Sequence, residues 1–208
     1  DGPAGEPILP DAAPEPHDPA IIRRKDYAPF PWRVPEIRLD FDLGLETTRV
    51  EAVLSVAPNP DAPAADEIRL DGDGLVLESV AVDGEQRNDW RREGEDLVVP
   101  LTAGEHRLTI VTRIAPSENT QLMGLYASGG MLCTQCEAEG FRRITFFPDR
   151  PDVLSVYTVR MAGDRGTFPV LLSNGNPVDE GTLEDGRHFA EWHDPWPKPS
   201  YLFALVAG

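Results

Sequence analysis

Hydrophobic and polar residues alternate along much of this chain. Ile37, Leu39 and Phe41 fall on one side of an extended segment, and charged residues occupy the positions between them. A period of two residues is the pattern of a half-buried β-strand. A second alternating run at residues 50–56 follows a short turn, so the pattern predicts a β-hairpin near the start of the ordered chain.

Short segments of the same kind continue to the end of the chain. The other expected strands are residues 68–70, 75–82, 97–101, 106–114, 153–161, 168–173, 178–183, 188–193 and 201–206. Asp-Gly and Asn-Gly pairs separate several of them, and such pairs favour tight hairpin turns. No segment shows a sustained helical period. The pattern predicts an all-β fold, a sandwich-like single domain of antiparallel strands.

The first 20 residues have a different composition. They contain six prolines among Ala, Gly, Asp and Glu, with no hydrophobic period. Such a segment cannot bury enough apolar surface to fold by itself. We therefore expect a disordered Pro-rich arm at residues 1–20 and a folded domain at residues 21–208.

The net charge of the chain argues against some classes of binding partner. The chain has 19 Lys and Arg against 36 Asp and Glu, a net charge of −17. Such a surface repels phosphate backbones and anionic lipid, so we expect neither nucleic acid nor a membrane as a partner. No run approaches the about 20 apolar residues of a membrane-spanning helix. Two cysteines are too few for a disulfide framework, which favours a cytoplasmic location.

Cys133 and Cys136 form a CxxC pair, which suggests either a zinc site or a redox site. A structural zinc ion takes four ligands, and the chain has no second such pair. A redox pair normally opens a helix, but the flanking residues look extended, where positions three apart point to opposite faces. His188 and His193 are five apart and would also diverge. The pattern favours two ordinary thiols and no metal site.

Gln135, Glu137 and Glu139 lie within five residues of one another. On an extended segment these three side chains share one face. An amide beside carboxylates can receive a cationic group, because a carboxylate accepts strong hydrogen bonds from an ammonium. A solvated polar strand face would have the same spacing, so both interpretations stay open.

Longer motifs carry a resemblance to a known family. They are NTQLMGLYASGGMLCTQCEAEGFRRITFFPDRPDV (residues 119–153), FPVLLSNGNPV (residues 168–178) and GTLEDGRHFAEWHDPWPKPSYLFALVAG (residues 181–208). Together they resemble the N-terminal domain of the zinc aminopeptidase N family, in particular its bacterial alanyl aminopeptidase branch. The resemblance covers roughly residues 27–208 and is dense after residue 119.

This resemblance implies a fold and a function. Family members remove the N-terminal residue of peptides with one catalytic zinc, which an HExxH helix and a downstream glutamate hold. Their N-terminal domain is a β-rich saddle that packs on the catalytic domain. Its segment matching residues 134–138 reaches the substrate. By this resemblance Glu137 binds the peptide's α-ammonium, and Gln135 lines the pocket for the first side chain.

The chain also departs from the family. It contains no HExxH and no GxMEN loop. We therefore expect no zinc and no peptidase activity in this chain alone, one catalytic zinc in the full-length enzyme, and as partners the catalytic domain of the same polypeptide and peptide substrates. The alternatives are a stand-alone β-sandwich module that binds peptides or proteins, and a redox or zinc protein built on the cysteine pair.

If the resemblance holds, the domain should expose a patch where the catalytic domain packs. Aromatic residues of the second half are candidates for this patch and equally for the core. These residues are Phe146, Phe147, Trp192, Trp196 and Tyr201.

Overall fold

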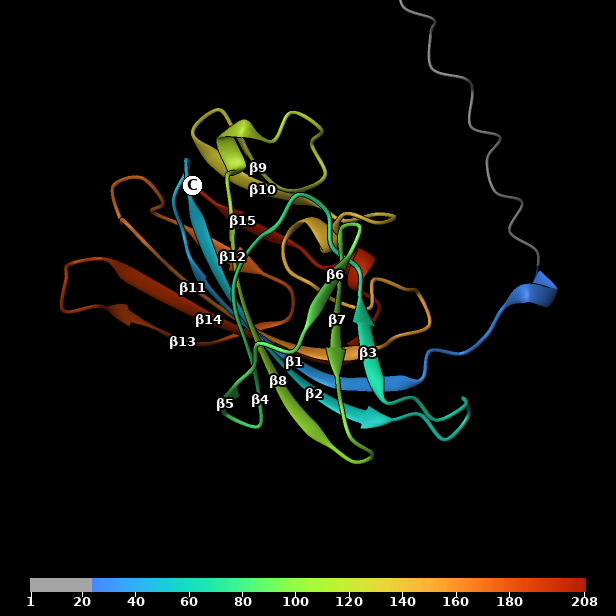
Figure 1. The fold of residues 1–208 in the computed structure, drawn as a ribbon. Helices are drawn as coiled ribbons and strands as arrows, with labels where there is room; N and C mark the ends of the chain where they lie inside the picture. The colour runs from blue at the N-terminus through green and yellow to red at the C-terminus, as the bar shows by residue number, and fades with distance from the viewer. Residues whose placement is uncertain (1–23) are drawn as a thin grey trace, which may run out of the picture.

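The computed structural model describes residues 24–208, so the arm predicted for residues 1–20 lies outside the described residues. One large curved sheet carries two smaller sheets, and the chain is nearly all β, which confirms the predicted fold class (Figure 1). Helical structure in the described part is limited to short 3-10 turns. These are η1 Arg24–Asp26, η2 Pro116–Glu118, η3 Phe141–Arg143 and η4 Ser200–Leu202.

The large sheet has eight strands in the order β13-β14-β11-β1-β2-β8-β4-β5. Their bounds are β1 Trp32–Asp42, β2 Thr48–Pro58, β4 Val76–Val82, β5 Glu85–Gln86, β8 His106–Ile114, β11 Ser155–Gly163, β13 Asn176–Thr182 and β14 His188–Lys198. The predicted hairpin is confirmed, because β1 and β2 pair antiparallel. The prediction of purely antiparallel strands is wrong at one place, since β1 and β11 pair in parallel.

The two smaller sheets supply the rest of the fold. The four-stranded sheet has the order β12-β15-β10-β9, and the three-stranded sheet has the order β3-β7-β6. Their bounds are β3 Glu67–Leu70, β6 Arg91–Glu93, β7 Asp96–Pro100, β9 Gly124–Ser128, β10 Met131–Gln135, β12 Leu171–Ser173 and β15 Leu205–Ala207. The strand predicted at residues 201–206 is much shorter, because η4 takes up its first residues.

The core forms from the alternating residues of the strands. Ile37, Leu39 and Phe41 of β1 are at most 2% exposed, as the period-two pattern predicts. One continuous cluster of buried side chains includes members of all three sheets, for example Ile68 of β3 and Leu205 of β15. The smaller sheets therefore pack on the large sheet around a single core.

The turn between β4 and β5 shows how local sequence sets a hairpin. Asp83 and Gly84 have φ values of 54° and 84°. A two-residue turn with positive φ at both positions matches the twist of the flanking strands, and Asp-Gly tolerates it. The predicted turn is confirmed at this position.

The aromatic candidates separate into two groups. Phe146 and Phe147 are fully buried and belong to the core. Trp196, in contrast, is 77% exposed. Trp192 packs at the edge of the core and donates from Nε1 to the carbonyl oxygen of Leu171 at 3.1 Å. Tyr201 is half-buried, so of the five candidates only Trp196 is mostly exposed to solvent.

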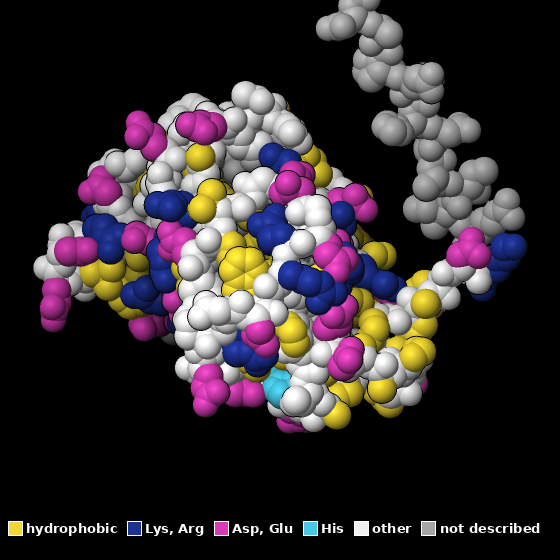
Figure 2. Space-filling model, in the orientation of Figure 1, with side chains coloured by type: hydrophobic (Ala, Val, Ile, Leu, Met, Phe, Trp, Pro, Cys, Tyr) yellow, Lys and Arg dark blue, Asp and Glu magenta, His cyan; other side chains and the backbone are white. Residues whose placement is uncertain are grey.

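Charged side chains of both signs are interspersed over the visible face of the molecule (Figure 2). Many of them form surface ion pairs, such as Arg33 with Asp61 at 2.8 Å. Such pairs contribute little stability singly, about 0–1 kcal/mol. Within residues 24–208 there is no helix with the length and apolar character needed to cross a membrane.

Candidate functional site

The candidate residues lie at the surface, at and just after the end of β10. β10 lies between β15 and β9, with Cys133 opposite Val206 on one side and Tyr126 on the other. The strand ends at Gln135, and residues 137–140 form a turn. The prediction that Gln135, Glu137 and Glu139 share one face of an extended segment is therefore wrong.

Close backbone packing ends the strand at this point. The amide of Gly140 donates to the carbonyl oxygen of Cys136 at 2.9 Å and closes the turn. A Cβ atom at position 140 would lie 2.3 Å from the carbonyl oxygen of Gln135, so only glycine fits there. The turn, not an extended face, decides where Glu137 points.

Gln135 and Glu137 still lie close together, but a hydrogen bond across the turn joins them and not a shared strand face. Both side chains are exposed, and Nε2 of Gln135 donates to the backbone carbonyl oxygen of Glu137 at 3.1 Å. Among the described residues, the Glu137 carboxylate has no hydrogen-bond or ion-pair partner. Glu139 differs, since its carboxylate lies 3.5 Å from Arg142. One carboxylate on this turn is therefore open to a ligand.

A threonine ties the strand end to the neighbouring sheet. Thr134 Oγ1 accepts a hydrogen bond from the amide of Leu205 at 2.8 Å and donates to its carbonyl oxygen at 3.2 Å. The side chain thus continues the β10–β15 pairing by one residue beyond the backbone ladder. The resemblance led us to expect Thr134 in a segment that reaches the substrate, and nothing in the sequence indicated its hydrogen bonds to Leu205.

The two cysteines behave as ordinary thiols. Cys136 is 3% exposed, and burial together with the nearby Asp149 carboxylate raises the pKa of its thiol to about 12. Cys133 is half-buried and points to the outer face of the sheet, and both thiols are free. A thiol with so high a pKa is a poor nucleophile and metal ligand.

An apolar surface adjoins the turn. Cross-strand pairing aligns Leu172, Val206, Cys133 and Tyr126 in one row over the outer face of the four-stranded sheet. Leu172 is 45% exposed, and the other three are half-buried. We call this row the outer apolar row. Gln135 extends from the same face of β10, so the row leads directly to the candidate site.

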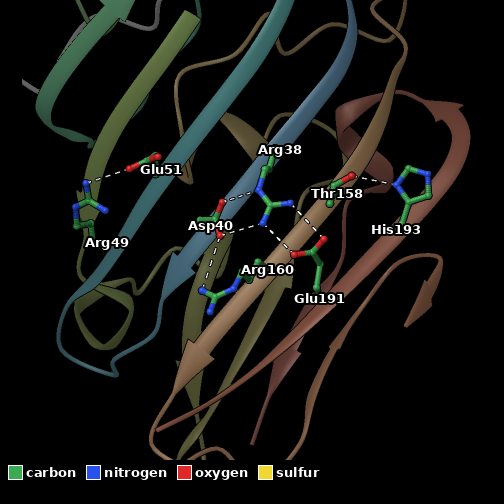
Figure 3. Close-up of polar contacts among 8 residues, drawn as sticks. All are labelled: Arg38, Asp40, Arg49, Glu51, Thr158, Arg160, Glu191 and His193. Atoms are coloured by element: carbon green, nitrogen blue, oxygen red, sulfur yellow. Dashed lines mark hydrogen bonds and ion pairs between the residues drawn. The ribbon is translucent and has the colours of Figure 1, made fainter. Parts of the chain in front are cut away.

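A second polar cluster lies on the large sheet, and the sequence pattern did not single it out (Figure 3). Arg38 donates to Asp40 at 2.9 Å and to Glu191 at 2.9 Å. The hydrogen bond that Arg38 donates to Glu191 is the main reason why the pKa of Arg38 is raised. Thr158 and His193 contact each other at 3.0 Å. These contacts join β1, β11 and β14 side by side, so the cluster is explained by strand pairing.

Comparison with known proteins identifies the family of this chain. The peptidase M1 N-terminal domain matches residues 33–202. This chain belongs to that family. It is 53% identical over 192 residues to aminopeptidase N of Caulobacter vibrioides, covering 91% of this chain and 22% of the relative. It is 47% identical over 187 residues to aminopeptidase N of Escherichia coli, covering 89% of this chain and 21% of the relative.

Solved structures agree with this assignment. Aminopeptidase A of Legionella pneumophila, in complex with aspartic acid, matches with a TM-score of 0.83 and 32% identity, covering 88% of this chain and 22% of that one. The M1 zinc metallopeptidase of Deinococcus radiodurans shares the fold, with a TM-score of 0.74 at 18% identity over 87% of this chain and 43% of that one. The M1 domain described here spans about a fifth of the length of its curated relatives.

The described residues of this M1 domain do not fit the zinc that is named for the related metallopeptidase of Deinococcus radiodurans. Within residues 24–208, no three His, Cys, Asp or Glu side chains come together in a way that could hold a metal ion. His188, for example, is buried, and its Nε2 contacts the carbonyl oxygen of Phe168 at 2.7 Å. No step of the chemistry is therefore assigned to a metal in this domain.

Proposed function

We propose that this M1 domain anchors the α-ammonium of a peptide substrate through Glu137, while the rest of a zinc aminopeptidase polypeptide supplies the zinc and the chemistry. The observation that carries the proposal is the Glu137 carboxylate itself. It is exposed, without a partner among the described residues, and held on a short closed turn. A fixed, unpaired carboxylate is suited to receive an ammonium group.

Anchoring at this point also explains a preference for chain ends. Once the catalytic domain covers the turn, the Glu137 carboxylate loses much of its contact with water. A free α-ammonium then pairs with it, whereas an internal amide nitrogen leaves it unpaired. By binding the α-ammonium, Glu137 would fix the position of the peptide so that its first peptide bond is the one that is cut. Gln135, held beside it, would line the space for the first side chain.

The outer apolar row supports a catalytic domain as the partner. Leu172 and its neighbours across the sheet form an apolar face that leads to Gln135. Relatives are about five times longer than the matched segment, so most of such an enzyme remains to cover this face. Domain interfaces of this kind bury about 600–1,500 Å². A partner seated here would enclose the Glu137 turn.

Peptidase assays test the proposed function as a whole. We expect this domain alone to leave alanine p-nitroanilide uncleaved when zinc is added, and we expect the full-length polypeptide to cleave it. Activity of the domain alone would contradict the division of labour. A full-length polypeptide without aminopeptidase activity would instead support the stand-alone binding module.

Thiol labelling tests the docking face. Cys133 is half-buried on the outer apolar row, so iodoacetamide should alkylate it in the isolated domain. In the full-length protein, we expect alkylation to be at least about tenfold slower, because the partner domain covers the thiol. Peptide mass spectrometry would measure both rates.

Cys136 is an internal control for this experiment. It is buried with a raised pKa, so it should react only after denaturation in either protein. Equal labelling rates of Cys133 in the two proteins would show that the catalytic domain packs elsewhere.

The cytoplasmic location and the absence of nucleic-acid and membrane partners stay predictions from composition. Fractionation of cells that express the full-length protein would test the location.

A further inference from the structure

A buried carboxylate is hydrogen-bonded to Arg142, which follows the Glu137 turn by two residues. The side chain of Asp149 is 1% exposed. Its Oδ2 atom accepts hydrogen bonds from Nε of Arg142 at 3.0 Å and from the amide of Arg142 at 3.2 Å. Its Oδ1 atom accepts a hydrogen bond from Ser200. Both carboxylate oxygens are therefore occupied by donors from two separate segments.

Arg142 connects this carboxylate to the turn. It lies two residues after Gly140, and its Nη2 atom lies 3.5 Å from Glu139 on the turn. It also donates from Nη2 to the backbone carbonyl oxygen of Asp149 at 3.1 Å. Two hydrogen bonds to Asp149 leave this guanidinium little freedom, because its planar fork fixes direction as well as distance. The end of the turn is thereby fixed to Asp149.

Ser200 connects the same carboxylate to the neighbouring strand. It lies in η4, five residues before Leu205 of β15. Thr134 lies near the end of β10, three residues before the turn, and its hydroxyl accepts from the amide of Leu205 and donates to the carbonyl oxygen of Leu205. Two clamps therefore tie the turn to the segment of residues 200–205, one at each end. The Glu137 carboxylate stands between them.

The chemistry of the cluster favours positioning over simple stabilisation. Burying an ion pair often adds no net stability, because desolvation opposes the attraction between the charges. A buried pair does impose a specific geometry. Both carboxylate oxygens of Asp149 already accept hydrogen bonds from protein donors, so Asp149 is not itself suited to bind a ligand. Its hydrogen bonds instead fix the position of Arg142, just after the Glu137 turn.

We propose that Asp149 is a positioning residue for substrate binding, which acts by holding the Glu137 turn through Arg142 and Ser200. This inference rests on the proposed function of Glu137. Misplacement of a binding group by about 1 Å can lower a rate by about a hundredfold. Loss of either clamp should therefore weaken catalysis without removing any group that touches the substrate.

A double-mutant cycle in the full-length enzyme tests this role. We expect Asp149→Asn to lower kcat/KM for alanine p-nitroanilide by about 10–100-fold. In a Glu137→Gln background, the same change should lower it by less than about threefold, because the carboxylate to be positioned is gone. Equal losses in both backgrounds would overturn the proposal, since Asp149 would then act independently of Glu137.

A matched control and a second variant keep the test decisive. Asp152→Asn makes the same substitution three residues away, at a carboxylate that pairs with Arg150 at 2.8 Å and has no bond to the turn. It should leave the kinetics unchanged. If Asp149→Asn does not fold, Thr134→Val loosens the other clamp while preserving shape, and the same cycle with Glu137→Gln applies.

The two hypotheses can fail separately. If Glu137→Gln by itself has no effect on kcat/KM, the anchoring role falls. If Glu137→Gln is harmful but neither clamp variant depends on it, only the positioning role of Asp149 falls.

Discussion

Replacing Glu137 with glutamine in the full-length enzyme is expected to lower kcat/KM for alanine p-nitroanilide by about 30–1,000-fold. Removing one partner of a covered ion pair typically weakens binding by about 2–4 kcal/mol, which corresponds to this range. Glutamine keeps the size and shape of the side chain but loses the charge that pairs with the α-ammonium. Steady-state kinetics at saturating zinc would measure the loss.

The stability of the domain should not change with this substitution. The Glu137 carboxylate has no partner among the described residues, so folding does not depend on it. Glu139→Gln is the matched control, two residues along the same turn. Its carboxylate is 70% exposed and lies 3.5 Å from Arg142, a contact worth at most about 1 kcal/mol. Equal kinetic losses in the two variants would refute the specific role of Glu137.

Replacing Phe141 with alanine is expected to destabilise the domain by about 3–5 kcal/mol. The ring is fully buried, and its centroid lies 5.2 Å from those of both Phe147 and Phe203. Tyr157 packs against it at 6.0 Å. Truncation leaves a cavity at the point where the Glu137 turn meets the core. Urea unfolding followed by tryptophan fluorescence would measure the change.

Leu122→Ala provides the comparison for this prediction. Leu122 is 54% exposed, so its truncation should change the free energy of unfolding by no more than about 0.5 kcal/mol. A loss below about 1 kcal/mol for Phe141→Ala would mean that the surrounding rings collapse into the space.

The sequence was sufficient to predict which strand side chains are buried. The buried positions Ile37, Leu39 and Phe41 follow from alternation alone, because side chains on a strand point to opposite faces in turn. The Asp83-Gly84 turn follows from its residues, since Asp-Gly tolerates positive φ at both positions. The all-β fold class rests on such local features.

Strand direction and strand ends could not be read in the same way. The parallel pairing of β1 with β11 joins residues more than a hundred positions apart, and alternation looks the same in either direction. β10 stops at Gln135 because Gly140 packs against the backbone there, a contact that exists only in the folded chain. Burial of Phe146 and exposure of Trp196 were likewise undecided by composition.

The candidate site divides in the same manner. Motifs in the sequence predicted Gln135 and Glu137 as substrate-binding candidates by resemblance, because a family motif is matched residue by residue. They did not identify Asp149, although a carboxylate directly after the apolar run TFFP was the available signal.

By itself, the sequence determined the strand-rich fold class and the family, and it named Gln135 and Glu137 as candidates, since these depend on local periodicity and residue identity. Only the tertiary structure decided that Glu137 stands on a closed turn and that Asp149 joins Arg142 to Ser200 behind it. Only it decided that an apolar row leads to Gln135. The physical reason is that these features arise from contacts between segments distant in sequence, and no local pattern records which segments meet.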